Sequence, residues 1–369
     1  MKRLCVIAFM IFTILLMANQ APQVEDISFS QRDDGSHIVD IYFNLIDQDG
    51  DLLTVTIIAS NNAGQSYDFP MSTYSGDFGE NINPGSSKHI IWDFAADHPG
   101  IWEPNMRFKI TVSDGHYDPD DEFDWATVPA GTYTWGENDE IQTFDYDYEI
   151  MVYEVTNQQY LNYLEEALVA GVIVVSTASV TGYYAGDENY SAGDYEFYNL
   201  DGSGYIHWSG NSFVLTAGYE DHPVNEVTWF GGNAFSEYFG WRLPTEQEWE
   251  KAARGMTGYE YPWGNSISGD RANYWNSGDP WDNGTTPVGY YNGENGTTDS
   301  PSPYGCYDMS GNVYDWTDSW YEPFSPRVLR GGSWYYSNGD DYLRSWFCFV
   351  NYPTSTSDFI GFRCSRTLP

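Results

Sequence analysis

The feature that constrains this chain most is a pair of glycine-anchored motifs near its C-terminal end. The first is Arg330-Gly331-Gly332-Ser333-Trp334, and the second is Gly361-Phe362-Arg363-Cys364. Glycine tolerates positive φ and close backbone approach, so each motif predicts a tight, fixed turn. Between them lies a run rich in Tyr, Ser, Asn, Asp, Phe, Thr and Val, with one cysteine, Cys348. The arrangement indicates a rigid frame that displays a surface.

The composition indicates a β-rich protein with two or more domains. The 369 residues allow more than one hydrophobic core, and 18% of them are aromatic, with 36 glycines and 18 prolines. Such a profile is typical of strands and loops rather than of helical bundles. The formal net charge is −39. Nucleic acid and anionic membranes should therefore be repelled, while the surplus carboxylates favour Ca²⁺.

The first 21 residues have the pattern of a secretory signal peptide. Lys2 and Arg3 provide a positive start, and the uncharged apolar run 4–18 follows. The run is short for a membrane span, which needs about 20 apolar residues. We therefore expect a secreted protein, extracellular or periplasmic, with no transmembrane segment beyond the signal, although an uncleaved anchor stays open.

Three cysteines remain once such a signal is removed, namely Cys306, Cys348 and Cys364. An odd number in an oxidising compartment permits at most one intramolecular disulfide. Cys348 and Cys364 both fall in predicted strands and could pair, but the sequence does not decide between pairing and free thiols.

Residues 22–117 alternate between apolar and polar side chains as half-buried strands do. The clearest runs are residues 38–43, 52–58, 89–92 and 106–112. Turn residues separate them, and the length fits an all-β sandwich of the immunoglobulin or fibronectin type. The turn with Asp47, Asp49 and Asp51 could hold Ca²⁺, although a tight hairpin with exposed acids is the simpler interpretation.

A short acidic linker at residues 118–123 separates this sandwich from a second domain at residues 124–369. Two amphipathic segments of that domain predict helices. One covers residues 157–168 and is capped by Thr156. The other begins after Thr245, which forms a capping box with Glu248.

Most of the rest of this domain has the composition of loops and needs something to fix it. Residues 181–215 predict an inserted hairpin. Four arginines stand out in a chain with only 15 basic residues, and we expect them to pair with carboxylates such as Glu246 or Glu250. These arginines are Arg242, Arg254, Arg330 and Arg363.

Several motifs follow one another in a fixed order through the second domain. They are Trp241–Gly255, Tyr261–Asn265, Tyr304–Trp316, Arg330–Trp334 and Gly361–Arg363. With residues 128–132 and 153–160 they closely resemble the formylglycine-generating enzyme family, also called the sulfatase-modifying-factor domain, over roughly residues 124–369. The resemblance implies a C-type-lectin-like fold with much irregular loop. The expected fold class is therefore α+β, preceded by an N-terminal all-β immunoglobulin-like sandwich.

The spacing around Asp308 predicts a calcium loop. Asp308 and Asp315 flank Gly311 and Val313, which places two carboxylates and two backbone carbonyls within eight residues. Ligands that are all oxygen suit Ca²⁺ rather than zinc or copper. The family that the chain resembles has calcium at the matching positions, with a glutamate where this chain has Asp315.

The same resemblance implies a second calcium site at Asn273, the carbonyl of Tyr274 and Asp282. The loop length differs from the family at this point, so Asp279 competes with Asp282 as the acidic ligand. Ca²⁺ is thus the expected cofactor at both sites.

Copper is not expected. Active members of the family bind it with two cysteines that follow the Gly-Gly-Ser motif, and oxidise a substrate cysteine to formylglycine with O₂. The matching positions here hold Tyr336 and Asp341, which cannot replace the soft thiolates that hold Cu(I). The disulfide partner that the resemblance implies for Cys364 matches Ala253. The six histidines are scattered, and no GxSxG, P-loop or GxGxxG motif is present, so no catalytic residue is predicted.

The function we expect is a calcium-stabilised binding module that presents residues 335–359 to a protein or glycan. Surfaces rich in Tyr, Ser and Asn recognise varied partners, and about half of the aromatic residues in the run are expected to be core. The predicted contact residues are Tyr335, Tyr336, Ser337, Asp341, Trp346, Phe347, Phe349, Asn351 and Tyr352.

Three alternatives remain open. The chain could be an enzyme of the same family with a divergent, unidentified reaction, or a structural protein of the cell surface. It could also be a ligand-binding protein diversified by a retroelement, since many residues of the run are those reached by randomising the adenines of an AAC codon. Relatives that differ only at adenine-templated positions would support the last of these.

Overall fold

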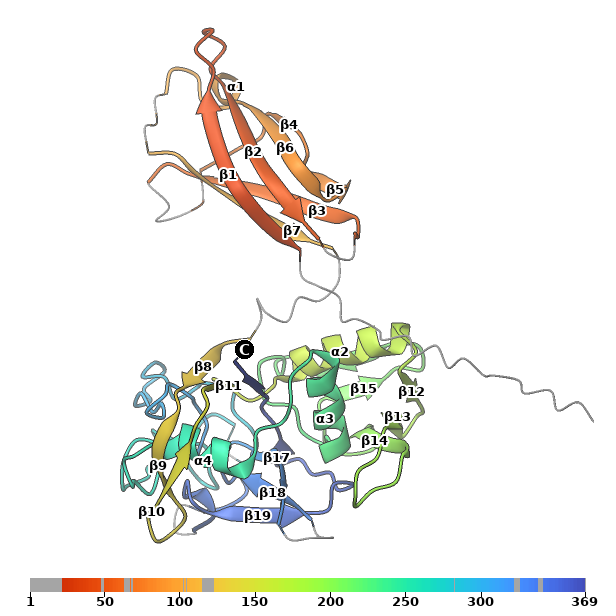
Figure 1. Cartoon of the computed structure of the whole chain (residues 1–369), viewed down its shortest axis with the longest axis vertical. Coiled ribbons are helices and arrows are strands. Elements are labelled where there is room, and N and C mark those ends of the chain that lie inside the picture. Colours follow the sequence, from red (N-terminus) through yellow and green to blue (C-terminus); the bar gives the residue numbers. More distant parts are fainter. Residues whose placement is uncertain are drawn as a thin grey trace, which may run out of the picture. The chain divides into compact units, whose positions relative to one another are not determined.

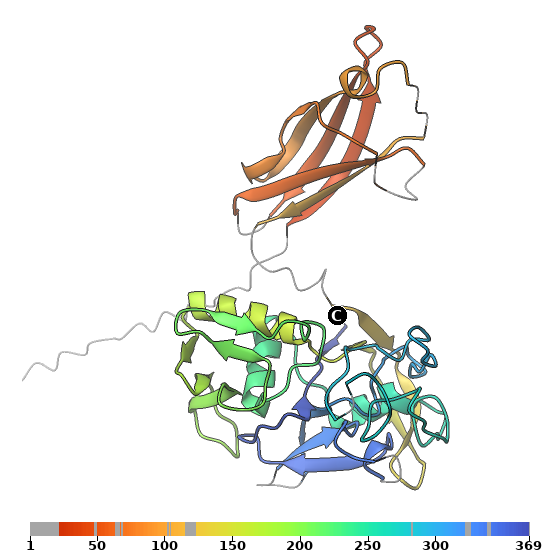
Figure 2. The same cartoon turned by 180° about the vertical axis from the view of Figure 1, so that it is seen from behind.

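The computed structural model of the chain describes residues 22–47, 50–62, 67, 69–101, 103, 105–114, 123–281, 283–321, 326–337 and 341–368. The chain divides into two compact units, residues 1–121 and 122–369. Figures 1 and 2 show the strands and helices of each unit from opposite sides. The predicted signal segment, residues 1–21, lies outside the described residues. Among those described, no helix combines the length and apolar character needed to cross a membrane.

Two antiparallel sheets make up the N-terminal unit, in the strand orders β1-β2-β6-β4 and β5-β3-β7. The runs predicted as strands overlap β2, β3, β6 and β7. The elements of this unit are β1 (Gln23–Gln31), β2 (Ile38–Ile46), β3 (Leu53–Ser60), β4 (Tyr74–Gly76), β5 (Gly79–Ile82), β6 (Gly85–Asp93), α1 (Phe94–Asp97) and β7 (Arg107–Ser113).

One hydrophobic core lies between these two sheets. Alternate residues of β2 and β3 point inward, for example Ile41 and Phe43 on β2 and Val55 on β3. The fully buried Trp92 of β6 donates its indole N–H to the carboxylate of Asp97, 2.8 Å away, so its polar atom is satisfied inside the core. Apart from the short helix α1 the described elements of this unit are strands, as the sequence predicts, and the likeness to immunoglobulin modules stays a prediction.

The C-terminal unit is mostly β, with few helices and long loops (Figure 1). Its first elements are β8 (Trp125–Val128), β9 (Gly131–Trp135), β10 (Glu140–Phe144), β11 (Tyr148–Met151), α2 (Asn157–Val169), β12 (Ile173–Val175), β13 (Ser179–Tyr184), β14 (Gly193–Asn199), β15 (Ile206–Trp208) and β16 (Phe213–Leu215). They are followed by α3 (Trp229–Tyr238), α4 (Glu246–Arg254), β17 (Tyr314–Trp320), β18 (Arg327–Arg330), a 3-10 turn (Asp341–Leu343), β19 (Cys348–Asn351), β20 (Ile360–Gly361) and β21 (Ser365–Thr367).

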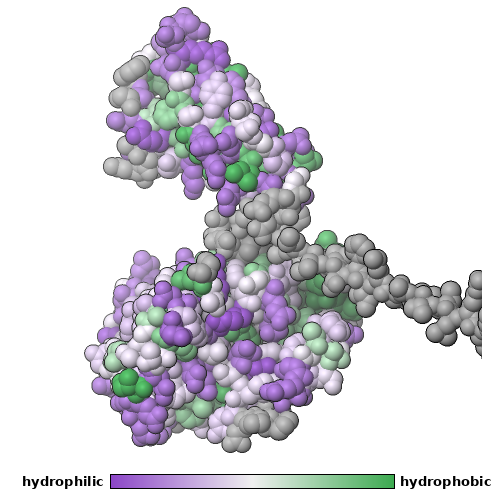
Figure 3. Space-filling model, in the orientation of Figure 1, coloured by the Kyte–Doolittle hydropathy of each residue, from purple (hydrophilic) through white to green (hydrophobic). Residues whose placement is uncertain are grey.

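Small sheets organise this unit. The one that positions the site has the order β19-β18-β17-β20, and the C-terminal strand β21 returns to pair with β11 beside β8. The predicted insertion forms two hairpins, β13-β14 and β15-β16. Between α4 and β17 the described residues form neither helix nor strand. In the view of Figure 3 most of the described surface is hydrophilic, in keeping with the net charge.

Both predicted helices are confirmed, together with their caps. Thr156 accepts a hydrogen bond from the backbone N–H of Gln159 at the start of α2. Thr245 and Glu248 form the expected capping box at the start of α4. These two helices could be found from sequence because their start signals are local.

Helix α3 is missing from the sequence prediction, because Gly231 and Gly232 in its first turn look like a loop. The structure gives a packing reason for Gly231. A Cβ atom there would lie 2.1 Å from the carbonyl oxygen of Phe197 on β14, so only glycine lets the helix approach that strand so closely.

A buried ion-pair network links α4 to β18. The carboxylate of Glu250 lies between two guanidinium groups, with Oε1 3.3 Å from Arg254 and Oε2 3.0 Å from Arg330. Arg330 also pairs with Glu246 at 2.9 Å. The predicted partners of Arg254 and Arg330 are thus confirmed, whereas Arg242 pairs with Glu248 and Arg363 pairs with Asp315. Directional, charged hydrogen bonds of this kind fix a helix against a strand.

Replacing Glu250 with Gln should destabilise the C-terminal unit, because two buried guanidinium groups would lose their shared counter-charge. Removing one partner of a buried ion pair costs about 3–5 kcal/mol. The matched control is Asp341→Asn, which removes a carboxylate that is 61% exposed and pairs with Arg344, where about 0–1 kcal/mol is at stake. Urea unfolding measures both losses, and equal losses would contradict the role given to Glu250.

His222 should make this unit less stable in mild acid. Its ring is buried, Nδ1 lies 2.9 Å from Thr285 Oγ1, and Nε2 has no hydrogen-bond partner among the described residues. Burial lowers the pKa of His222 to about 4. The unfolded chain, with a histidine pKa of about 6.5, therefore binds more protons between pH 6.5 and 4, so stability falls as pH decreases through that range.

The variant His222→Gln should lose this part of the pH dependence. Thermal unfolding between pH 7 and 4 measures the stability of both proteins. The difference between them at each pH gives the contribution of His222, because the other titrating groups are the same in both. Parallel stability–pH curves for the two proteins would show that His222 is not the responsible group.

Candidate functional site

The loop that carries the predicted binding surface leaves strand β18 through two glycines. Gly331 and Gly332 both have positive φ, 99° and 76°. A Cβ atom on Gly332 would lie 2.6 Å from the carbonyl oxygen of Tyr342, so a larger residue would push the 3-10 turn away. The glycine pair therefore holds the start of the loop against the 3-10 turn, as a tight fixed turn requires.

All nine predicted contact residues are at least partly accessible. Tyr335 and Tyr352 are 53% and 63% exposed, and Asp341 is exposed as well. The other six are half-buried, namely Tyr336, Ser337, Trp346, Phe347, Phe349 and Asn351. The expectation that half of the aromatic residues are core is therefore wrong, because these rings pack against one another at the surface.

Ring contacts hold this surface in shape. Tyr336 lies 4.3 Å from the ring of Tyr342 and 5.9 Å from that of Tyr314, measured between centroids. Phe349 stacks on Tyr314 at 5.4 Å, and Tyr335 stacks on Phe359 at 5.3 Å. Such edge and face contacts order large side chains before any partner arrives.

Trp275 belongs to this surface, although no sequence motif pointed to it. Its backbone N–H donates to the carbonyl oxygen of Tyr336 at 2.9 Å, and the residue is 41% exposed. Trp275 directly follows Asn273 and Tyr274, two ligands of the predicted second calcium site. The predicted calcium loop and the binding surface therefore adjoin each other.

Tyr336 and Asp341, which the sequence resemblance predicts to stand at the copper-binding positions, are engaged within the protein. Tyr336 takes part in the ring cluster, and the carboxylate of Asp341 lies 2.9 Å from the guanidinium of Arg344. Arg344 also pairs with Glu260. Both side chains are held by neighbours, and neither is a soft ligand.

The cysteines at 306, 348 and 364 are free thiols, which answers the question of a disulfide that the sequence left open. Cys306 and Cys364 are buried. Cys348 lies opposite Arg330 in the β18–β19 register, and burial raises the pKa of its thiol. None of these three cysteines is bonded to another, so they form no disulfide at the loop that carries the predicted binding surface.

The first predicted calcium loop precedes and enters β17. Asp308 is buried, and its Oδ2 accepts the backbone N–H of Gly289 at 2.6 Å. Asp315 Oδ2 accepts hydrogen bonds from Arg363 Nε and from the indole N–H of Trp249, both at 2.7 Å. Its Oδ1 is buried and has no hydrogen-bond partner within the part of the chain that the structure describes.

Glu154 is a further buried carboxylate of this region that the sequence prediction missed. Its Oε2 accepts from Asn312 Nδ2 at 2.7 Å, and its Oε1 accepts from the backbone N–H of Val313 at 3.2 Å. Burial, together with the nearby charges of Asp308 and Asp315, raises the pKa of Glu154 well above its usual range. The motif at residues 153–160 contained Glu154, but only the fold brings it to the loop.

The carboxylates of this region are oxygen donors of the kind that a hard cation binds, but Glu154, Asp308 and Asp315 do not bring three ligand atoms within 4.8 Å of one another, which among the described residues Asp47, Asp51 and Asp114 do. Within the described part of the chain, Glu154, Asp308 and Asp315 are buried carboxylates near one guanidinium, that of Arg363, and burial raises the pKa of Asp308 to about 6. Buried carboxylates in excess over cations must bind protons or a metal ion. Asp315 Oδ1, with no partner, is an oxygen of the kind that Ca²⁺ prefers.

The second predicted calcium loop is only partly described. Asn273 is buried, its Nδ2 donates to the carbonyl of Gly284 at 2.8 Å, and its Oδ1 has no partner among the described residues. The carbonyl of Tyr274 accepts the N–H of Ser277 at 2.9 Å. The carboxylate of Asp279 accepts a hydrogen bond from the backbone N–H of Trp281, and Asp282 lies outside the described residues.

The two predicted calcium loops contact each other. The backbone N–H of Asn312 donates a hydrogen bond to the carbonyl oxygen of Asn273.

The acidic turn of the N-terminal unit gathers different residues from those in the sequence motif. Carboxylate oxygens of Asp47, Asp51 and Asp114 lie within 4.8 Å of one another, while Asp49 is outside the described residues. Asp47 Oδ1 accepts the backbone N–H groups of Gly50 and Asp51, as in a tight hairpin.

Comparison with known proteins assigns the C-terminal unit to a protein family. The sulfatase-modifying factor enzyme 1-like domain matches residues 117–368, and the chain belongs to this family. The resemblance seen in the sequence motifs is thereby confirmed.

Individual relatives cover only part of the chain. A protein of Chlamydia pneumoniae named serine/threonine-protein kinase pkn1 is 35% identical over 236 residues, 59% of this chain and 32% of its own length. The inactive C-alpha-formylglycine-generating enzyme 2 of Mus musculus is 40% identical over 158 residues, 39% of this chain and 49% of its own. The chain thus spans a third to a half of these relatives. The crystal structure of CarF shares 21% identity over 67% of this chain and 99% of its own, with a TM-score of 0.46.

Added Ca²⁺ should raise the melting temperature of the C-terminal unit, and EDTA should lower it. A ligand at about 100 times its dissociation constant stabilises by about 2.7 kcal/mol, or roughly 5–10 °C for a unit of this size. The variant Asp308→Asn should respond less, while Asp201→Asn, at an exposed turn, should respond as the unaltered protein does. Identical melting curves with Ca²⁺ and with EDTA would eliminate the calcium hypothesis.

Proposed function

We propose that this protein is a secreted, calcium-stabilised binding module of the sulfatase-modifying-factor family that does not make formylglycine. One observation carries the proposal, namely the state of the two positions that match the copper cysteines. Tyr336 is packed among aromatic rings, and Asp341 forms an ion pair with Arg344. Copper(I) needs soft sulfur ligands, and neither a phenol nor a carboxylate supplies them.

The name of one relative supports the proposal that this chain does not make formylglycine. The mouse protein that is 40% identical over its matched region is named an inactive formylglycine-generating enzyme. We propose that this chain shares that inactivity. Cys348 does not restore the missing ligands, because it lies in strand β19 opposite Arg330 and away from the two altered positions in sequence.

The surface around residues 335–359 has the properties of a binding site. Tyr335, Tyr352 and Trp275 expose large rings, and their neighbours are fixed by the contacts described above. Ordered aromatic side chains lose little freedom on binding and supply most of the energy at many interfaces. The proposed partner is a protein or a glycan, both of which such rings can contact by stacking.

Export and calcium fit this role. The signal-like segment at residues 1–21 would take the chain to the extracellular or periplasmic space. Calcium bound at Asp308 and Asp315, and at Asn273 beside Trp275, would stiffen the loops under the binding surface. The metal would therefore support the shape of the surface and take no part in a reaction.

The purified protein should leave a Cys-x-Pro-x-Arg peptide unchanged in the presence of copper and O₂. Mass spectrometry distinguishes a cysteine from the aldehyde of formylglycine, and an active family member serves as the positive control. Conversion of the peptide by this chain would overturn the proposal that the oxidase chemistry is lost.

Binding should depend on the exposed rings. An array of glycans and extracellular proteins is probed with the unaltered chain and with the double variant Tyr335→Ser/Tyr352→Ser, which should lower the affinity for any specific ligand by at least about tenfold. The control is Tyr183→Ser, at a tyrosine that is 66% exposed on β13. Equal losses in both variants, or none in either, would contradict the placement of the site.

A further inference from the structure

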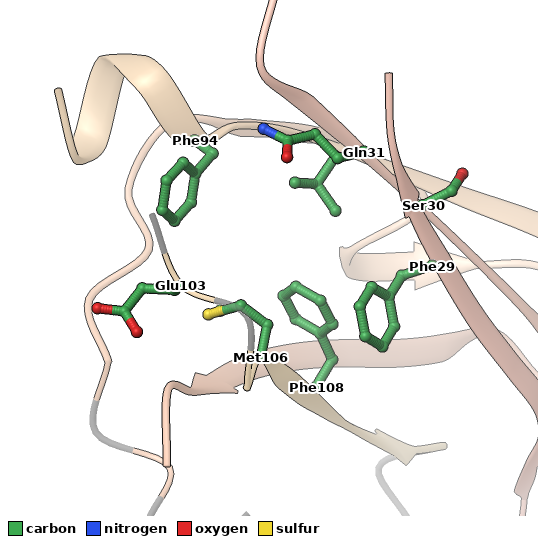
Figure 4. A pocket seen from close by; sticks show the side chains of 8 residues that line it. Phe29, Ser30, Gln31, Phe94, Glu103, Met106 and Phe108 are labelled. Carbon is green, nitrogen blue, oxygen red and sulfur yellow. The ribbon is translucent and has the colours of Figure 1, made fainter. Parts of the chain in front are cut away.

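A pocket of about 320 Å³ opens into the core of the N-terminal unit (Figure 4). Phe94, Met106 and Phe108 form part of its wall and belong to the hydrophobic core between the two sheets. Phe29 of the edge strand β1 lies beside Phe108, with ring centroids 4.9 Å apart and planes at 75°. Three of the eight lining residues, Phe29, Phe94 and Phe108, are therefore aromatic, and Val39 and Met106 add aliphatic surface.

Strand β1 leaves this pocket accessible. Its pairing with β2 shifts register between Glu25 and Ser28, and Asp26 has a φ of 53°, so a bulge precedes Phe29. Phe29 remains 41% exposed although it touches the core ring of Phe108. Accessible aromatic surface that continues into a core is a common property of ligand pockets.

Among the described lining residues the polar groups include one carboxylate and no basic side chain, while Arg107 outside the lining donates to the carbonyl oxygen of Met106 at 2.7 Å. Glu103 contributes a half-buried carboxylate, with Ser30 and Gln31 as neutral groups. None of the eight lining residues is basic. Arg32 follows Gln31 in sequence, but its guanidinium is held by both carboxylate oxygens of Asp40, at 2.7 and 2.8 Å.

We propose that this pocket binds an organic ammonium ion with an apolar substituent. Faces of aromatic rings attract cations, and the carboxylate of Glu103 adds a counter-charge while the apolar wall accepts the substituent. The volume, about 320 Å³, is at the lower end of the roughly 300–1,000 Å³ of small-molecule pockets. A net charge of −39 also concentrates cations near the chain.

The same features disfavour other ligands. A fatty acid would bring its carboxylate toward Glu103 and toward a strongly negative protein. A hard metal ion would find one carboxylate among mainly apolar side chains, whereas it prefers six or more oxygen ligands. This site lies in the N-terminal unit and is independent of the function proposed for the C-terminal unit.

The test uses three probes of equal chain length on the full-length protein, namely hexyltrimethylammonium, 1-hexanol and hexanoate. Methyl NMR of ¹³C-labelled methionine reports binding through the signal of Met106. We expect the ammonium probe to shift that signal saturably, with an affinity at least about threefold higher than that of the alcohol, as a partly exposed cation–π contact predicts. No shift at Met106, or tighter binding of the alcohol or the acid, would overturn the proposal.

Two variants separate charge from hydrophobicity. Glu103→Gln and Phe29→Leu should each weaken ammonium binding about threefold and leave hexanol binding nearly unchanged, since the first keeps the size of the side chain and the second keeps an apolar side chain while removing the ring face. Glu80→Gln, at an exposed carboxylate on β5 outside the pocket, is the control for net charge and should have no effect. Equal effects of Glu103→Gln and Glu80→Gln would show that the protein's general charge attracts the probe, against a specific site.

Discussion

The ion pair between Arg363 and Asp315 is the interaction on which the C-terminal unit depends most. Arg363 Nε donates to Asp315 Oδ2 at 2.7 Å, and Nη1 donates to the carbonyl oxygens of Met151 and Val152 at 3.3 and 3.1 Å. One buried guanidinium thus joins β17, the end of β11 and the last segment of the chain. In a unit of small sheets and long loops, such directional charged hydrogen bonds hold together segments that no sheet or helix hydrogen bonds connect.

The balance of buried charges links the Arg363–Asp315 ion pair to the proposed calcium site. Among the described residues, Arg363 is the buried counter-charge near Glu154, Asp308 and Asp315, so the carboxylates are in excess and must hold protons or a metal ion. A divalent cation would relieve this excess, and it would do so next to Gly331 and Gly332, where the binding loop begins. The frame and the proposed metal sites are therefore parts of one electrostatic arrangement, which does not require the copper-binding positions.

Local signals in the sequence were sufficient for α2 and α4, whose capping residues lie within a few positions of the helix start. Helix α3 was missed because the reason for Gly231 is the carbonyl of Phe197, which only the fold brings within 2.1 Å. The partner of Arg363 lies 48 residues away, and Glu154 reaches Val313 from 159 residues away. The motifs identified the family, but the contacts that hold the predicted surface residues are long-range and come from the structure alone.

Anomalous X-ray diffraction from crystals grown with Ca²⁺ and Cu(I) tests the central claim most directly, which is that the family frame is kept while its copper site is lost. We expect a calcium signal beside Asp308 and Asp315 and no copper signal near Tyr336 and Asp341. A copper signal at those two residues or at Cys348, with no calcium at the acidic loop, would contradict the account.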